Sequence, residues 1–127
     1  MSKSAAAAGA EPVLDPSALD AIRSIGQPGL LAKVIALYRS ETPKQLAQLR
    51  EAAAAGDGPL LFRAAHTMKS SSRNLGGTRL GAICASCEAQ AKAGQVAEAT
   101  ALVAVIEREF AALDAALAAC GGAGAAG

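Results

Sequence analysis

The stretch Asp57–Gly77, DGPLLFRAAHTMKSSSRNLGG, decides the fold of the chain. It opens with the turn-forming residues Asp-Gly-Pro at 57–59, which also suit the start of a helix, and it closes with a Gly-Gly pair at 76–77, which stops one. Between these ends, apolar and small residues recur at spacings of three and four, as on one face of a helix. We therefore predict a helix from Leu60 to about Asn74.

The same kinds of signal predict helices on both sides of this stretch. Each is bounded by an N-cap residue, a proline or a glycine: a short one from Asp15-Pro16 to near Gly26, one from Pro28 to Gly56, one capped by Thr78 that stops at Gly94, and one from near Val96 through Leu117. Pro43 falls inside the second of these, where it should cause a kink or a local break because proline lacks the backbone donor.

Composition supports an all-α fold. Aromatic residues make up 2% of the chain, hydrophobic residues 52%, and alanine, the strongest helix former, dominates the apolar set. No segment alternates with the period of a strand. Short connections between the helices favour an antiparallel up-down-up-down four-helix bundle with a short extra N-terminal helix. We place this bundle at residues 13–119, between a disordered tail at 1–12 and a disordered Gly/Ala tail at 120–127.

The overall charge excludes some classes of function. The formal net charge is +1 and aromatic residues are scarce, so neither a nucleic-acid-binding nor a membrane-surface protein is indicated. No apolar run reaches the roughly 18 residues of a membrane-spanning helix, and the N-terminus lacks the apolar core of a secretion signal. With three cysteines and no such signal, the expected location is cytoplasmic.

His66 is the only histidine of the chain. At about 100° per residue, the small and apolar residues of its helix fall on the side opposite His66: Leu61, Ala64, Ala65, Met68, Ser71, Ser72 and Leu75. The residues that fall near its own direction form a second strip: Phe62, Arg63, Lys69, Ser70 and Arg73. We therefore expect His66 to face solvent among three cations.

An exposed imidazole among cations is suited to carry a phosphoryl group. Imidazole is largely neutral and nucleophilic near neutral pH, and neighbouring cations stabilise an added dianion. A solvated surface histidine beside ordinary Lys and Arg side chains would show the same pattern. Geometry alone leaves both interpretations open.

The local sequence resembles the active-site helix and the following helix of histidine-containing phosphotransfer (HPt) domains. That family has an Ala-His pair, a Lys three residues later, then a small residue, and Leu-Gly nine and ten residues past the His. The corresponding residues here are Ala65-His66, Lys69, Ser70 and Leu75-Gly76, and the match continues with Leu80, Cys84 and Glu88 in the next helix. The resemblance extends over roughly residues 13–119.

The resemblance implies a role for each matched residue. His66 would be phosphorylated at Nε2, and Glu88 would accept a hydrogen bond from Nδ1–H and fix the tautomer. Lys69 would offset the phosphoryl charge. Ser70, where many members have Gly, would still leave room for a partner, and Gly76 would permit the turn between the two helices.

The resemblance also implies partners. The chain would be a phosphorelay intermediate that exchanges a phosphoryl group between His66 and aspartates of response-regulator receiver domains, with a hybrid sensor histidine kinase as a further partner. It would need no cofactor of its own, because the receiver brings Mg²⁺. Apart from the resemblance, a single exposed strip around His66 needs no second copy of the chain, so we expect a monomer, while the apolar surface of the Ala-rich helices leaves a dimer open. Docking is expected on an apolar patch with a basic rim: Phe62, Arg63, Arg73 and Arg79.

Two other interpretations concern catalysis and metal binding. The chain has no ATP-binding motif, so we expect a phosphocarrier and not an enzyme; the alternative is a non-catalytic helical module that regulates a partner by docking. Cys84 and Cys87 have the spacing of half a zinc site, but both fall on the apolar stripe of their helix, which favours a core role. Cys120 is expected to be a free thiol.

Overall fold

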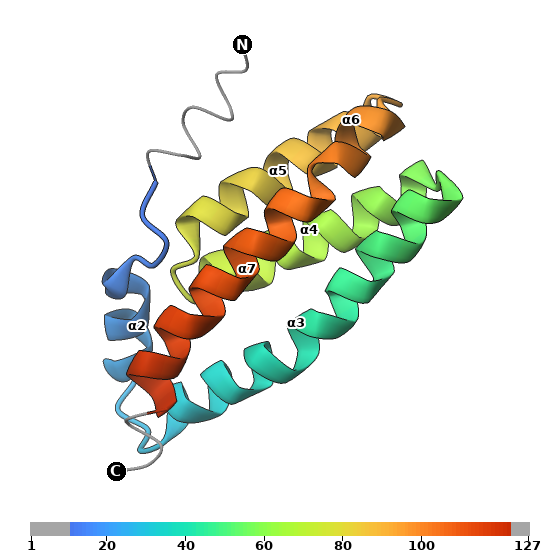
Figure 1. The fold of residues 1–127 in the computed structure, drawn as a ribbon. Helices are drawn as coiled ribbons and strands as arrows, with labels where there is room; N and C mark the ends of the chain where they lie inside the picture. The colour runs from blue at the N-terminus through green and yellow to red at the C-terminus, as the bar shows by residue number, and fades with distance from the viewer. Residues whose placement is uncertain (1–10, 123–127) are drawn as a thin grey trace.

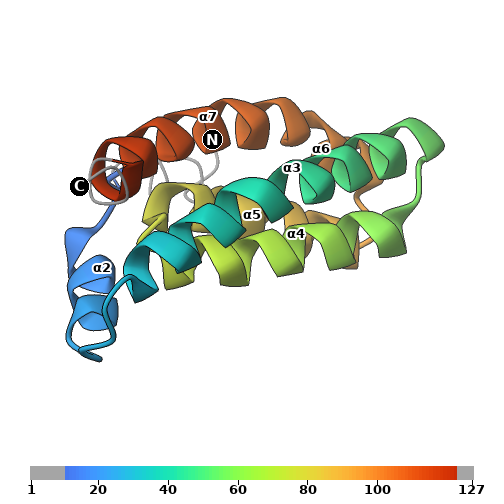
Figure 2. The same ribbon diagram turned by 90° about the horizontal axis from the view of Figure 1, so that it is seen from below.

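The computed structural model describes residues 11–122, which form helices joined by turns. The elements are α2 (Pro16–Arg23), α3 (Leu30–Ala55), α4 (Gly58–Asn74), α5 (Thr78–Lys92), α6 (Val96–Ala101), α7 (Val103–Leu117) and a π-helical turn η1 (Ala118–Gly122). Figure 1 shows α3, α4, α5 and α7 lying along one another, each running back along the one before it, with α2 at one end. In Figure 2, α4 and α7 lie on opposite sides of the bundle. The all-α prediction is confirmed.

The predicted caps of α2 and α4 form as expected. Asp15 accepts a hydrogen bond from the Ser17 amide at 3.0 Å, and Asp57 accepts one from the Leu60 amide at 3.0 Å. A carboxylate in this position satisfies an amide that has no partner within the helix. Because Asp57 is the cap, α4 begins at Gly58, two residues before the predicted start.

Of the two outcomes predicted at Pro43, a kink or a local break, the break does not occur, because α3 continues through Pro43 from Leu30 to Ala55. Proline removes the bond to the carbonyl of Arg39, four residues earlier. Both Arg39 and Pro43 are exposed, so the lost bond lies on the solvent-facing side of α3, where water replaces a protein donor. Gly56, with φ of 63°, ends the helix as predicted.

The last predicted helix is divided in two. Leu102 lies between α6 and α7, and its amide bonds to the carbonyl of Ala99 at 3.1 Å, a tighter turn than that of an α-helix. Both Ala99 and Val103 are buried. No glycine or proline marks this turn in the sequence, so the pattern gave no signal for it.

The predicted cap at Thr78 is also wrong. Gly77 occupies the N-cap position, and Thr78 begins α5 and donates its hydroxyl to the carbonyl of Pro12 at 2.9 Å. The same carbonyl accepts the Arg79 amide at 3.2 Å, and the carbonyl of Glu11 accepts from the Arg79 side chain at 2.9 Å. Glu11 and Pro12, which the sequence analysis assigns to the N-terminal tail, are thus hydrogen-bonded to the start of α5.

Part of the predicted C-terminal tail is helical. Residues 120–122 belong to η1, and Cys120 is an exposed free thiol. Residues 1–10 and 123–127 lie outside the described part of the chain. No helix among residues 11–122 is long and apolar enough to cross a membrane.

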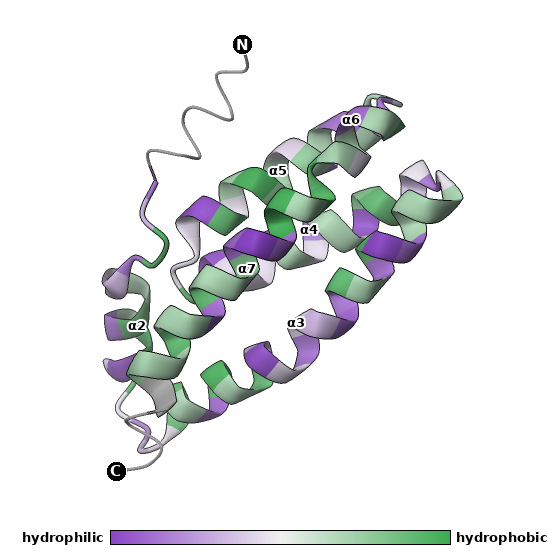
Figure 3. Cartoon of the chain, in the orientation of Figure 1, coloured by the Kyte–Doolittle hydropathy of each residue, from purple (hydrophilic) through white to green (hydrophobic). Residues whose placement is uncertain are grey.

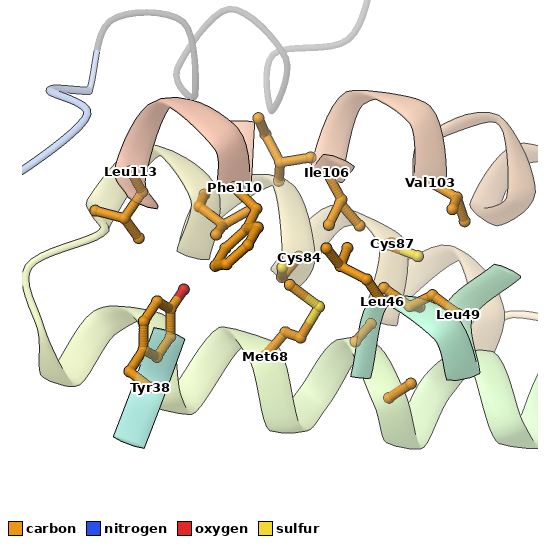
Figure 4. Close-up of a cluster of buried hydrophobic side chains, with 14 of the residues drawn as sticks. Tyr38, Leu46, Leu49, Met68, Cys84, Cys87, Val103, Ile106, Phe110 and Leu113 are labelled. Carbon is orange, nitrogen blue, oxygen red and sulfur yellow. The ribbon is translucent and has the colours of Figure 1, made fainter. Parts of the chain in front are cut away.

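A single hydrophobic cluster fills the space between the helices. Polar and apolar residues alternate in blocks along α3 and α7 (Figure 3), as amphipathic helices require. Met68 points from α4 into the cluster that includes Cys84 and Phe110 (Figure 4). The hydroxyls of Tyr38 and Ser72 hydrogen-bond at 2.7 Å within this core. Burial raises the pKa of Tyr38 to about 12, so this phenol keeps its proton.

Candidate functional site

The turn between α4 and α5 sets the register of the two helices that carry the site. Gly76 has φ of 83°, a conformation that disfavours every side chain. A Cβ at Gly76 would also collide with the carbonyl oxygen of Asp15, and the Asp15 amide bonds to the Gly76 carbonyl at 2.7 Å. The structure therefore requires glycine here for two separate reasons, and the predicted turn is present.

His66 and Glu88 meet across these two helices. The distance between His66 Nδ1 and Glu88 Oε2 is 2.7 Å. The His66 side chain is 55% exposed, whereas that of Glu88 is 13% exposed. A carboxylate only accepts hydrogen bonds, so Nδ1 carries the proton and Nε2 of the neutral ring keeps its lone pair. The partly exposed ring therefore has one nitrogen bound to Glu88 and another, Nε2, with no hydrogen-bond partner among residues 11–122.

Lys69 binds the other oxygen of the same carboxylate. Its Nζ forms an ion pair with Glu88 Oε1, and its side chain is 21% exposed. Burial raises the pKa of Glu88, but the hydrogen bonds from Lys69 and His66 outweigh this effect and leave the pKa below its usual value. Glu88 is therefore ionised near neutral pH, with each oxygen bound to a partner on α4.

Phe62 packs against the face of His66. The two ring centroids are 6.1 Å apart and the rings are inclined by only 17°. Phe62 precedes His66 by one helical turn, the spacing at which helical side chains meet. The stack and the Glu88 bond together restrict the orientation of the imidazole.

The strip around His66 is basic and includes small residues. Within α4 there are three basic residues and no acidic one. Arg63, Ser70 and Arg73 are exposed, as the periodicity predicts. The stem of Arg73 lies across Gly81 of α5. A Cβ at Gly81 would come within 2.7 Å of Arg73 Cγ, so the contact needs a residue without a side chain. Sequence reasoning missed this role of Gly81, and a glycine inside a helical pattern was the available signal.

Arg79 lies elsewhere. Its Nε donates to the Glu11 carbonyl at 2.9 Å, and its Nη1 lies 3.7 Å from Glu109 Oε1 on α7. Within the described part of the chain it makes no hydrogen bond or ion pair with His66, Lys69 or Glu88. These contacts tie Arg79 to the N-terminal segment and do not support its predicted place in the docking rim.

The cysteines of α5 are core residues, as predicted. Cys84 and Cys87 are both fully buried. Burial raises the pKa of Cys84 to about 12 and that of Cys87 to about 11, and a protonated thiol is a poor metal ligand. No group of three or more His, Cys, Asp or Glu that could hold a metal ion occurs in residues 11–122.

Comparison with known proteins identifies the family. The Hpt domain family matches residues 33–116, and no curated protein matches the chain. The crystal structure of histidine-containing phosphotransfer protein B (HptB) from Pseudomonas aeruginosa PAO1 superposes with a TM-score of 0.82 at 27% sequence identity, covering 87% of this chain and 95% of that one. The chain belongs to the Hpt domain family, whose members are phosphocarriers in two-component signalling.

Proposed function

We propose that the chain is a phosphorelay intermediate that carries its phosphoryl group on Nε2 of His66. The 2.7 Å bond between His66 Nδ1 and Glu88 supports this most strongly. A bond to an ionised carboxylate favours the proton on Nδ1 and leaves Nε2 with its lone pair. The donors and acceptors are aspartates of receiver domains, on a response regulator or a hybrid sensor kinase.

The transfer step follows from this geometry. The lone pair of Nε2 attacks the phosphorus of an aspartyl phosphate, so that the N–P bond forms while the P–O bond to the aspartate breaks and the carboxylate leaves. The imidazole becomes positively charged, and the ionised Glu88 at Nδ1 offsets this charge, as a carboxylate does for a catalytic histidine. Reversal of the same step returns the phosphoryl group to an aspartate.

The surface around His66 suits a partner that brings negative charge. A receiver presents its aspartate and phosphoryl group, and α4 presents basic residues with no carboxylate of its own. Phe62, Arg63, Ser70 and Arg73 surround His66 on this surface. Receiver-bound Mg²⁺ stabilises the transferring phosphoryl group from the partner's side.

Phosphoryl transfer from a receiver tests the proposal. A receiver domain loaded with Mg²⁺ and a small-molecule phosphodonor is incubated with the wild-type chain, with His66→Gln, and with Thr67→Ala as a control for the neighbouring hydroxyl. Wild type and Thr67→Ala should gain an acid-labile, base-stable label, and His66→Gln none. If no receiver labels the folded wild-type chain, the proposal fails and a module that acts by docking alone becomes the better account.

A further inference from the structure

The two nitrogens of the His66 ring face different parts of the surface. Nδ1 is directed at Glu88, which projects from α5. The nitrogens of an imidazole point in widely different directions, so Nε2 faces away from Glu88 and hence away from α5. A phosphoryl group on Nε2 would therefore lie on the side of His66 that faces away from α5.

The basic residues that follow His66 lie on the α5 side. Lys69 pairs with Glu88, and the stem of Arg73 lies across Gly81. At about 100° per residue, Lys69 is rotated from His66 by about 60° toward α5 and Arg73 by about 20° in the same direction. Lys69 could reach a phosphoryl group on Nε2 only by leaving Glu88, which would release the carboxylate that orients the ring.

Arg63 lies on the other side of His66, in the preceding turn. It is rotated by about 60° in the direction away from α5. Arg63 is exposed and has no acidic partner among residues 11–122, whereas four other arginines each pair with a carboxylate: Arg23, Arg39, Arg50 and Arg79.

The His66 ring also leans toward the turn that holds Arg63. Side chains on a helix incline toward its N-terminus, and the stack of His66 on Phe62 shows this inclination. Arg63 thus belongs to the turn toward which the ring inclines and, by its rotation, to the side of His66 that faces away from α5. Arg63 is the basic residue of α4 on this side of His66, and its side chain forms no ion pair with a residue of the described chain.

We propose that Arg63 is the residue of this chain that binds the phosphoryl group on His66, while Lys69 holds Glu88 in place. This inference rests on the proposed function. The planar guanidinium donates paired N–H bonds that match phosphate oxygens, whereas the ammonium group of Lys69 is already bound to a carboxylate. Arg63 therefore stabilises the phosphorylated form specifically.

The position of the transfer equilibrium tests this role. The ratio of phosphorylated chain to phosphorylated receiver is measured at equilibrium for wild type, Arg63→Gln, Arg63→Lys and Arg108→Gln. Arg108 of α7 is exposed and has no ion pair within residues 11–122. Arg108→Gln therefore removes one positive charge, as Arg63→Gln does, and serves as the matched control. A residue that only docks the receiver would change the rates in both directions and leave this ratio unchanged.

We expect Arg63→Gln to lower the ratio about threefold to tenfold, because one charge-assisted hydrogen bond is lost at an exposed site. Arg63→Lys should recover part of it, and Arg108→Gln should match wild type. In the wild-type chain, phosphorylation by phosphoramidate should also shift the Arg63 Nε–H signal in a ¹H–¹⁵N spectrum.

Three results would overturn the inference. A labelled wild type with an unchanged ratio in Arg63→Gln would exclude Arg63 and leave the phosphocarrier role intact. If the ratio of phosphorylated chain to phosphorylated receiver fell in Lys69→Gln but not in Arg63→Gln, the phosphoryl contact would be assigned to Lys69 instead. A wild-type chain that takes up no label at all would contradict both the proposed function and this inference.

Discussion

The two faces of α4 differ in what they do with their polar groups. On the inner face, Ser72 is fully buried and its hydroxyl is bonded to Tyr38. On the outer face, His66 and Arg63 are exposed, and each has a polar group that no described residue engages: Nε2 and the guanidinium. The polar groups of the inner face are satisfied within the chain, whereas those of the outer face would be satisfied only by a phosphoryl group or a partner.

This difference predicts that stability and phosphotransfer can be changed separately. Buried side chains contribute to the folded state through packing and satisfied hydrogen bonds. Exposed groups contribute little to stability, so the outer face can hold unpaired cations at low cost. Changes to the inner face should alter unfolding, and changes to the outer face should alter transfer.

The largest effect is expected on the inner face, at Met68. Its side chain is fully buried in the central cluster. Met68→Ala should lower the free energy of unfolding by about 2–5 kcal/mol, the usual cost of such a cavity. Urea denaturation measures this loss. Phosphoryl uptake should persist where the variant is still folded; a selective loss of uptake would contradict the separation of the two faces.

The buried hydrogen bond should give a smaller loss of stability. Tyr38→Phe leaves the Ser72 hydroxyl buried without its partner, at a cost of about 1–3 kcal/mol. The double variant Tyr38→Phe/Ser72→Ala removes both groups and should cost less than the sum of the single changes. Additive losses in a double-mutant cycle would show that the two hydroxyls do not act as a pair.

Glu88 connects the faces, because it lies at the edge of the core and binds the exposed ring. Glu88→Ala should slow transfer from a receiver about tenfold or more, since the charge-assisted bond to Nδ1 is lost. Glu88→Gln should recover much of the rate, because its amide oxygen can accept the same bond. Rapid-quench kinetics would measure both; equal rates in wild type and Glu88→Ala would rule out an orienting role.

Acid should remove the contribution of Glu88 to stability. Its folded pKa is below the usual value, because the bonds from Lys69 and His66 outweigh the effect of burial. A group with a lowered folded pKa stabilises the protein above its unfolded pKa of about 4.3, and this contribution is lost as pH falls through the folded pKa. The unfolding free energies of wild type and Glu88→Gln should therefore converge in acid; a difference that persists at low pH would contradict this pairing.

The smallest effect is expected from a hydroxyl on the outer face. Thr67 is exposed and donates to the carbonyl of Arg63 at 3.0 Å. Thr67→Ala should change the free energy of unfolding by no more than about 0.5 kcal/mol, as is usual for surface positions. A loss as large as that of Tyr38→Phe, measured by the same denaturation, would remove the distinction between the faces.

Much of α4 could be predicted from sequence because its signals are local. The apolar spacing places Met68 and Ser72 inside and His66 outside, and Asp57 marks the start of the helix. The partnership of His66 with Glu88 links residues 22 positions apart, and only the resemblance to HPt domains implied it. Periodicity assigns a face to each residue but does not say which residue of another helix it meets.

The features that sequence missed depend on distant contacts. Thr78 has the character of a cap, but its hydroxyl binds the carbonyl of Pro12, which is 66 residues away in the chain. Arg79 was grouped with the basic residues near His66, although its partners are Glu11 and Glu109. The turn at Leu102 has no glycine or proline to mark it. Tertiary contacts override local preference in each case.

The tautomer and phosphorylation site of His66 test the central claim most directly. Because the chain has one histidine, a long-range ¹H–¹⁵N spectrum of the imidazole needs no assignment by mutation. We predict a proton on Nδ1 before phosphorylation and phosphorus on Nε2 afterwards. A proton on Nε2 in the free protein, or phosphorus on Nδ1, would contradict the conclusion that Glu88 holds one nitrogen and presents the other.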